Sequence, residues 1–245
     1  MKTINMRRSI RKYSSREVGD PLLKTLLRDS ERTQTMGNLQ LYSVVITRDA
    51  GKKAELAPAH FHQPMVGEAP VVLTFCADFR RTSLWAENRK ATPGYGNILS
   101  FLNAATDTLL YCQTFCNLAE EEGLGLCFLG TTVYMPKEII RVLRLPKLVF
   151  PVATITLGWP DESPELSDRL PLEAIVHKET YEDYTPDRID RFYQPKEALP
   201  ENKHFVEINR KETLAQVFTD IRYTRKDNEA MSEGLLEALR QQGFL

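Results

Sequence analysis

The stretch from 98 to 119 constrains the fold of this chain more than any other part of the sequence. It is long and rich in apolar residues, and polar residues such as Asn103 and Asp107 interrupt it. Because it falls short of the roughly 18 uninterrupted apolar residues of a membrane helix, we expect no membrane span. Its apolar residues cover more than one face of a helix predicted over 97–122. A helix of this kind is buried in a large core or a subunit interface, so we expect it to be the central structural helix, capped by Gly123.

The rest of the chain divides into segments with the composition of strands and segments with the periodicity of helices. The predicted strands are 40–48, 71–77 and 150–158, with an apolar turn or short strand at 125–131. A helix is predicted over 20–32, with Asp20 as its N-cap and Pro21 as its first residue. Further helices are predicted at 52–57, 80–90, from 136 onward, and at 186–193, 211–221 and 228–242. The segments 33–38, 60–64 and 159–171 are predicted to be loops.

The composition permits a substantial core and excludes some classes of function. A chain of 245 residues with 42% hydrophobic residues fits one large domain, or one domain with an extension. The net charge is −1, from 32 basic and 33 acidic residues. A general nucleic-acid binder usually has a basic excess, so we expect no nucleic-acid partner, and any basic site must be local.

Neither the cysteines nor the histidines are predicted to form a metal site. All four cysteines lie inside apolar runs, at Cys76, Cys112, Cys116 and Cys127. Reduced, buried thiols are typical of a cytoplasmic protein, and the basic start of the chain lacks the apolar segment of a secretory signal. Cys112 and Cys116 share a helix face but have no companion Cys or His pair at ligand spacing, so we expect no metal. His60 and His62 are predicted to be surface or loop residues.

The segment Arg7-Arg8-Ser9-Ile10-Arg11 gathers three guanidinium groups and a hydroxyl before the first apolar run. Arginine presents a rigid fork of N–H donors that matches a phosphate. A phosphate monoester carries a charge of about −1.5 to −2 and needs more than one such partner. On this segment alone a solvated basic N-terminus is the commoner explanation, so other residues must decide.

Further candidate ligand-binding residues are dispersed along the chain. They are the polar loop 33–38 with Gln40, Gln63, the apolar turn 125–131 and Arg169. With the arginine segment they would suit a ligand that has one phosphate, a polyol and a large flat ring with carbonyls and ring nitrogens. Motifs of other sites fail: there is no Walker A loop, HExxH or G-x-S-x-G, and the Gly-x-Gly at 123–125 follows a helix instead of a strand.

The order and spacing of these segments resemble the FMN-dependent nitroreductase/flavin reductase superfamily, and most closely its oxygen-insensitive NADPH nitroreductase branch. The resemblance runs from about 7 to 181, with weaker similarity to the C-terminus. The residues that carry it are Arg7-Arg8-Ser9-Ile10-Arg11, Leu39-Gln40, Gln63, Cys76-Ala77-Asp78-Phe79, Gly123-Leu124-Gly125, Leu129-Gly130, Leu157-Gly158-Trp159-Pro160 and Arg169-Leu170-Pro171.

The resemblance implies an α+β fold in which helices flank a mixed sheet, and an obligate homodimer with the long helix at its core. Residues 1–181 would form the FMN-binding core. Residues 182–245 would form a helical extension that wraps the partner subunit. Two FMN sites would lie at the subunit interface.

The resemblance also assigns the cofactor contacts. The residues implied to bind the phosphate and ribityl chain are Arg7, Arg8, Ser9 and Arg169. Arg11 would reach the N1/O2 edge of the flavin, where a cation stabilises negative charge. The residues implied to hold the cofactor from the neighbouring subunit are Thr35, Met36, Gly37 and Asn38. Gln63 would bond the pyrimidine edge, Leu129 and Gly130 would pack near the ring, and Arg210 would bind the NADPH phosphate.

Three departures from the family pattern bear on these assignments. Residues 34–37 replace a run that is often rich in serine, and Thr131 replaces a usual glycine. Ser167 and Asp168 stand where the branch often has lysine, so a carboxylate lies beside Arg169. These departures put FMN affinity and the preference between NADH and NADPH in question.

The resemblance implies an FMN-dependent NAD(P)H oxidoreductase that works by ping-pong hydride transfer, without a catalytic side chain. Its partners would be NADPH or NADH and a small aromatic electron acceptor: a nitroaromatic, a quinone or a flavin. One alternative is a non-catalytic flavin-binding or sensing protein of the same fold. Another is a helical scaffold organised by the helix at 97–122.

Overall fold

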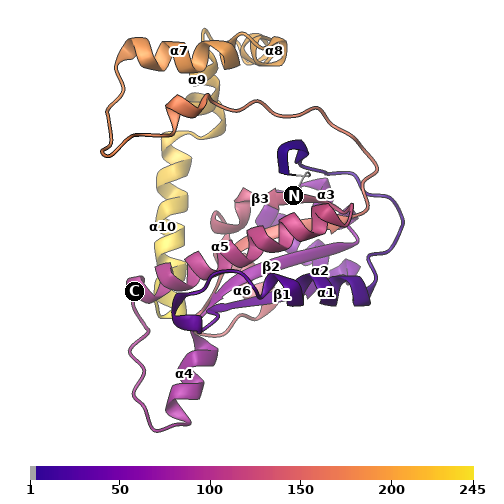
Figure 1. Ribbon diagram of the computed structural model, residues 1–245, viewed down its shortest axis with the longest axis vertical. Coiled ribbons are helices and arrows are strands. Elements are labelled where there is room, and N and C mark those ends of the chain that lie inside the picture. The colour runs from indigo at the N-terminus through magenta and orange to yellow at the C-terminus, as the bar shows by residue number, and fades with distance from the viewer. Residues whose placement is uncertain (1–3) are drawn as a thin grey trace. The chain divides into compact units, whose positions relative to one another are not determined.

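The structure is a computed structural model that describes residues 4–245 (Figure 1). The chain divides into two compact units. The first contains the residues up to Glu165 together with Met231–Leu245, and the second is Leu166–Ala230. This boundary falls before the predicted one at 181/182, and the end of the chain belongs with the first unit. The predicted wrapping of a partner subunit by 182–245 concerns a second chain and stays a prediction.

A four-stranded sheet forms the centre of the first unit. Its order is β1 (Tyr42–Thr47), β2 (Val71–Asp78), β4 (Val149–Gly158), β3 (Gly125–Leu129). All four were predicted within a few residues of these bounds. Every pairing between them is antiparallel, so the prediction of a mixed sheet is wrong for the described residues. β2 is buried along its whole length, as its continuous apolar run predicts.

The long helix α5 (Ile98–Glu121) lies across one face of this sheet. Asn97 caps it by accepting a hydrogen bond from Ser100 N. At the other end Gly123 has φ +83° and donates to Glu120 O, while Leu124 N donates to Ala119 O. These are the two bonds of a Schellman cap, so the prediction that Gly123 caps the helix is confirmed.

Within the single chain the helix is buried on one face, which agrees with the prediction of a central structural helix, and the predicted subunit interface stays a prediction. Its core face carries Tyr111, Phe115 and Ala119, which pack against Phe75 of β2 and neighbouring residues. The opposite face exposes large apolar side chains: Ile98, Leu99, Leu102, Leu109 and Leu110, with exposed fractions from 40% to 66%. Exposed apolar residues in such a group mark an interaction surface.

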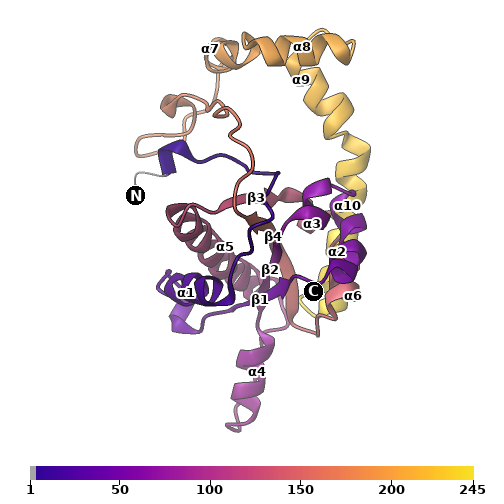
Figure 2. The same ribbon diagram turned by 90° about the vertical axis from the view of Figure 1, so that its right-hand side faces the viewer.

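Shorter helices cover both faces of the sheet. Figure 2 shows α1 (Asp20–Ser30) with α5 on one side, and α2 (Ala50–Leu56), α3 (Pro64–Glu68) and α6 (Pro136–Leu143) on the other. The remaining short helices of this unit are α4 (Arg80–Glu87) and the 3-10 helices η1 (Ile4–Met6), η2 (Met36–Asn38), η3 (Ala57–His60) and η4 (Gly130–Val133).

Two local predictions need correction. Asp20 is the first residue of α1 and not its N-cap, which is Gly19, and no side chain caps the helix. The loop predicted at 60–64 is confirmed for 61–63 but is shorter than predicted, because η3 ends at His60 and α3 begins at Pro64. A proline stands among the first residues of each, where its fixed φ and missing N–H suit a helix start.

The second unit is mainly helical. It contains η5 (Leu172–Ala174), α7 (Pro186–Glu197), α8 (Pro200–Ile208), α9 (Leu214–Gln216), a π-helix η6 (Val217–Arg222) and the start of α10 (Arg225–Gln242). The predicted segments 186–193, 211–221 and 228–242 are confirmed in outline. α8 was not predicted; it begins at Pro200, and Pro195 lies inside α7 without ending that helix.

The four cysteines are free and buried, as predicted. No group of three or more His, Cys, Asp or Glu side chains within residues 4–245 is arranged to hold a metal ion. None of the helices formed by these residues combines the length and apolar character that crossing a membrane requires.

Candidate functional site

The N-terminal segment 7–13 lies against the edge strand β3. Ile10 N donates to Leu126 O at 2.9 Å. Gly125 permits this approach, because a Cβ at that position would lie 2.8 Å from three side-chain carbons of Ile10. The glycine that looked like part of a nucleotide motif therefore has a packing role: it brings the arginine segment onto the sheet.

Residues 161–163 fix the same segment from the other side. One carboxylate oxygen of Glu162 accepts from Arg11 N at 2.5 Å and from Lys12 N at 3.1 Å. These backbone hydrogen bonds, that of Arg11 above all, lower the pKa of Glu162. Arg8 Nη1 donates to Ser163 Oγ at 2.8 Å. The segment is thus anchored through its backbone and through one side-chain donor of Arg8, and because a guanidinium has five N–H donors, others remain for a ligand.

A pocket of about 200 Å³ lies between this segment and the C-terminal end of α5. Its lining residues are Met6, Arg7, Arg8, Ile10, Glu120, Gly123, Leu124 and Gly125. The Nε atom of Arg8 is buried and has no hydrogen-bond partner among residues 4–245. Burial raises the pKa of Glu120, and the charge of Arg7 opposes that shift. Two guanidinium groups, one with a buried unused donor, suit an anionic ligand group.

Arg11 extends along β3 toward the predicted ring-binding turn. Burial raises the pKa of Cys127, and the nearby guanidinium of Arg11 opposes that shift, which places Arg11 beside the Cys127 sulfur. Cys127 and Leu129 are two residues apart on one strand and therefore share a face of the sheet. Gly130 follows at the strand end, and no atom lies within 4 Å of the position its Cβ would take. Arg11, Leu129 and Gly130 are therefore brought to one edge of the sheet.

His60 joins the Gln63 segment to this edge. Its Nδ1 lies 2.9 Å from Thr131 Oγ1, and its backbone carbonyl accepts from Gln63 Nε2 at 3.1 Å. The side chain is fully buried, so the prediction of a surface or loop histidine is wrong. Burial lowers the pKa of His60 to about 4, and a neutral imidazole with one hydrogen bond can be accommodated in the core. Gln63 and Gly130 are thus held near each other, as the predicted site requires.

The loop that contains Thr35, Met36, Gly37 and Asn38 is exposed and lies elsewhere in the first unit. Buried Asp107 of α5 holds it in place, because its two carboxylate oxygens accept from Met36 N at 2.9 Å and from Leu41 N at 3.2 Å. Sequence reasoning treated Asp107 only as an interruption of the apolar helix. A carboxylate in an otherwise apolar helix is the signal that could have identified it.

The structure does not bring this loop to the arginine segment. The loop leads into β1, whereas the arginine segment lies alongside β3. These two strands are at opposite edges of the sheet. Three inter-strand spacings of about 4.8 Å separate them, or roughly 14 Å. Within the first unit, the residues predicted to contact the cofactor therefore form two separate groups.

Arg169 and Arg210 belong to the second unit. Arg169 is exposed, and its Nη1 donates to Asp168 O at 2.8 Å and to Ser167 O at 3.3 Å. Arg210 is exposed in the turn after α8, with φ +52°. Both side chains have the exposure that a ligand contact needs.

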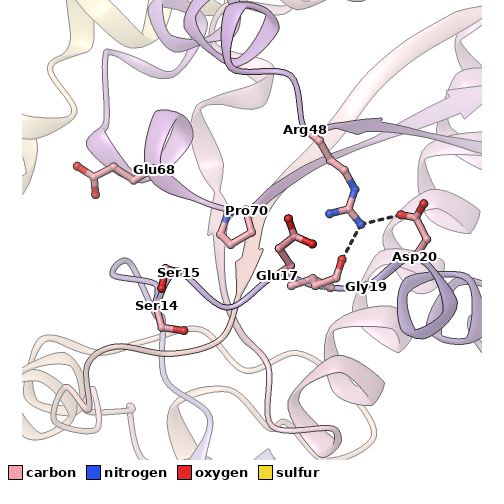
Figure 3. Close-up of a pocket in the computed structure, with 9 residues that line it drawn as sticks. Ser14, Ser15, Glu17, Gly19, Asp20, Arg48, Glu68 and Pro70 are labelled. Carbon is pink, nitrogen blue, oxygen red and sulfur yellow. Dashed lines mark hydrogen bonds and ion pairs between the residues drawn. The ribbon is translucent and has the colours of Figure 1, made fainter.

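A larger pocket of about 640 Å³ is lined by none of the residues predicted to bind the cofactor or the nucleotide (Figure 3). Glu17, Asp20 and Glu68 line it together with Arg48. Arg48 is engaged within the protein, because Nη2 donates to Val18 O at 2.8 Å and to Asp20 Oδ1 at 3.0 Å. The pocket has no unpaired buried donor comparable with that of Arg8, and we assign it no function.

Comparison with known proteins places this geometry in a family context. Residues 4–159 match the model of the Nitroreductase family. A crystal structure of a protein from Bacteroides fragilis NCTC 9343 is 63% identical, covers 100% of each chain and superposes with a TM-score of 0.99. The FMN reductase [NAD(P)H] of Bacillus subtilis (strain 168) is 32% identical over 186 residues, 74% of each chain. The oxygen-insensitive NADPH nitroreductase of Salmonella typhimurium is 30% identical over 71% of each chain.

Proposed function

This chain belongs to the Nitroreductase family, and from that premise we propose that it is an FMN-dependent NAD(P)H oxidoreductase. The family match and the relatives named as FMN reductase and NADPH nitroreductase support the proposal. The structural observation that carries it is the arginine segment docked on β3, with a buried donor of Arg8 left unpaired.

The residues of the first unit fit FMN in charge and in chemistry. Arg7, Arg8 and Ser9 offer several donors for one phosphate and the adjacent ribityl hydroxyls. Gln63 would offer an amide to the pyrimidine edge, and the backbone at Gly130 is open, because no atom lies within 4 Å of the position its Cβ would take, while Leu129 is buried beneath it in the core.

Bound FMN would supply the chemistry of hydride transfer, in ping-pong order, between NADPH or NADH and a nitroaromatic, quinone or flavin. The protein contributes position and charge. Arg11 would hold a positive charge at the N1/O2 edge, where negative charge gathers during the reaction. His60 would keep the Gln63 segment and the turn at Gly130 in register, through its bonds to both.

The proposed active form is a homodimer, with Thr35, Met36, Gly37 and Asn38 supplied by the neighbouring subunit. Two observations support this. These residues and the arginine segment lie at opposite edges of one sheet. The face of α5 that includes Leu99 and Leu102 is apolar and exposed in the single chain. Burial of that face would favour association, since each Å² of apolar surface removed from water contributes about 25 cal/mol. The extension 182–245 would contribute to the same assembly.

Two residues of the second unit complete the proposal. Arg169 would bind the FMN phosphate, and Arg210 would bind the phosphate of NADPH. Replacing Arg169 with alanine should weaken FMN binding by about 1.5–3 kcal/mol, the range for a hydrogen bond to a charged group. Arg225 is a matched control, because it is an exposed arginine of the same unit that pairs with Glu229. Arg225→Ala should leave the FMN titration unchanged.

The direct test is to purify the protein, titrate it with FMN and record the visible spectrum. NADPH and NADH oxidation is then followed with nitrofurazone as acceptor. We expect a yellow protein with acceptor-dependent turnover. A colourless protein with only background oxidation would refute the proposal.

A second candidate is a flavin-binding protein without turnover. Thr131 favours it, because its hydroxyl is bound to His60 at a turn where a glycine is usual in the family. Anaerobic addition of NADPH separates the two candidates. Bleaching of bound FMN supports the oxidoreductase, and FMN that stays oxidised supports the second candidate.

A further inference from the structure

Asp168 places a carboxylate directly before Arg169, the proposed phosphate-binding residue. An unpaired carboxylate there would repel a phosphate and lower its affinity. It would also be a competing partner for the Arg169 guanidinium. In the structure that guanidinium donates through Nη1 to two backbone carbonyls, those of Ser167 and Asp168. A guanidinium has five N–H donors, so further donors of Arg169 remain for a ligand.

The Asp168 carboxylate is engaged by Lys196 instead. Lys196 Nζ lies 3.1 Å from Oδ1 and 2.9 Å from Oδ2. The two side chains are only 28% and 31% exposed, so solvent screens this pair less than a fully exposed one. Lys196 stands in the last turn of α7, where the helix dipole favours a cation. Its backbone carbonyl accepts from Asn202 Nδ2 at 2.8 Å, which fixes the end of the helix.

We infer that Lys196 is a positioning residue for anion binding, because it neutralises Asp168 and leaves Arg169 as the uncompensated charge of the segment 167–169. The inference rests on the proposed function, in which Arg169 binds the FMN phosphate. Lys196 would act through Asp168 and need not touch the cofactor. The lysine that the family often places in this segment would thus be replaced by one from a distant helix, whose charge cancels the local carboxylate.

The size of the effect follows from electrostatics. Without Lys196, the Asp168 charge would act on a phosphate of charge about −1.5 to −2. For a separation of about 8 Å and an effective dielectric constant of about 40–80, this repulsion corresponds to an affinity about four-fold to thirty-fold weaker. Riboflavin has no phosphate, so its affinity should not change.

The test measures the dissociation constants of FMN and riboflavin, by flavin fluorescence, for the wild type and three variants. The variants are Lys196→Met, Asp168→Asn and the double variant. Lys196→Met should bind FMN about four-fold to thirty-fold more weakly and riboflavin as the wild type does. Asp168→Asn should bind FMN at least as tightly as the wild type does. The double variant should bind FMN within about two-fold of the wild type, because it loses one positive and one negative charge and the net charge near Arg169 is unchanged.

The matched control is Lys211→Met, which removes a comparable pair with Asp220 in the same unit. It should leave FMN affinity unchanged. The inference is overturned if Lys196→Met leaves FMN affinity unchanged, if riboflavin affinity falls equally, or if the double variant is as weak as Lys196→Met. Failure of the proposed function would look different, because the wild type itself would then bind no FMN.

Discussion

Replacing Asp107 with asparagine should release the loop 33–41 from α5. The two carboxylate oxygens of this buried residue accept 2.9 Å from Met36 N and 3.2 Å from Leu41 N. An asparagine side chain has one oxygen and one NH₂ group, so one of the two backbone N–H groups would face another donor. The change keeps the size of the side chain and removes one hydrogen bond together with the charge.

The expected loss follows from the two interactions affected. A hydrogen bond to a charged group contributes about 1.5–3 kcal/mol, and a buried donor left unpaired costs about 1–3 kcal/mol. We expect Asp107→Asn to lower the free energy of unfolding by about 3 kcal/mol. For a chain of this length, that corresponds to a decrease in Tm of about 6–12 °C. FMN affinity should fall as well, because this loop is part of the proposed site.

Urea unfolding of the FMN-free protein, followed by circular dichroism at one protein concentration, measures this loss. Asp29→Asn is the control, since Asp29 is an exposed carboxylate of α1 and its replacement should change the free energy of unfolding by less than about 0.5 kcal/mol. If Asp107→Asn were as stable as this control, the two backbone hydrogen bonds would not be what holds the loop.

Three further predictions concern the edge of the sheet and the surface of α5. Burial lowers the pKa of His60 from 6.5 to about 4, so the neutral imidazole stabilises the fold above pH 6.5, and this contribution is lost as the pH falls from 6.5 toward 4. Between pH 7.5 and 4.5, the free energy of unfolding measured in urea should therefore fall by about 2–3 kcal/mol more for the wild type than for His60→Gln. His62→Gln should keep the pH dependence of the wild type. Gly125→Ala should destabilise the protein by about 1–3 kcal/mol in the same assay and weaken FMN binding, because the new Cβ would overlap the docked N-terminal segment. Gly67→Ala, on a helix with no atom near the new Cβ, should instead stabilise it by up to about 1 kcal/mol. Leu102→Glu, on the exposed apolar face, should convert the proposed dimer to monomer in analytical ultracentrifugation.

A specific result would contradict each of these three predictions. Parallel pH profiles for the wild type and His60→Gln would show that the imidazole is not kept neutral by burial. Equal stability of Gly125→Ala and the wild type would show that the N-terminal segment does not dock closely on β3. A dimer that survives Leu102→Glu would place the interface on another surface.

The elements with long, regular patterns could be predicted from the sequence. The helix at 97–122 and the strand at 71–77 each contain enough apolar residues for their periodicity or continuity to decide the structure. The errors arise where local signals are ambiguous. Pro64 was predicted to end a loop and no helix was predicted at Pro200, although a proline also suits a helix start and each of these begins a helix. The strand directions were wrong because pairing depends on which segments meet in space, and the sequence does not record this directly.

The candidate site was predictable in part. The arginine segment 7–11 has a composition that suits an anion, and its anion binding stays a prediction. The supporting residues could not be found in this way, because their partners are distant along the chain. Asp107 bonds backbone groups 66 and 71 residues away, and Lys196 pairs with a carboxylate 28 residues away. His60 looked like a loop histidine because nothing nearby in the sequence indicates its burial or its bond to Thr131.

The placement of the loop 33–41 and the arginine segment at opposite edges of one sheet has a genetic consequence. In the proposed dimer, each catalytic centre would take its arginines from one polypeptide and its loop from the other. Co-expression of an Arg8→Ala chain with an Asp107→Asn chain would give mixed assemblies in which one centre carries both lesions and the other carries none. Two defective alleles would then restore activity together, a complementation that a centre confined to one polypeptide does not allow.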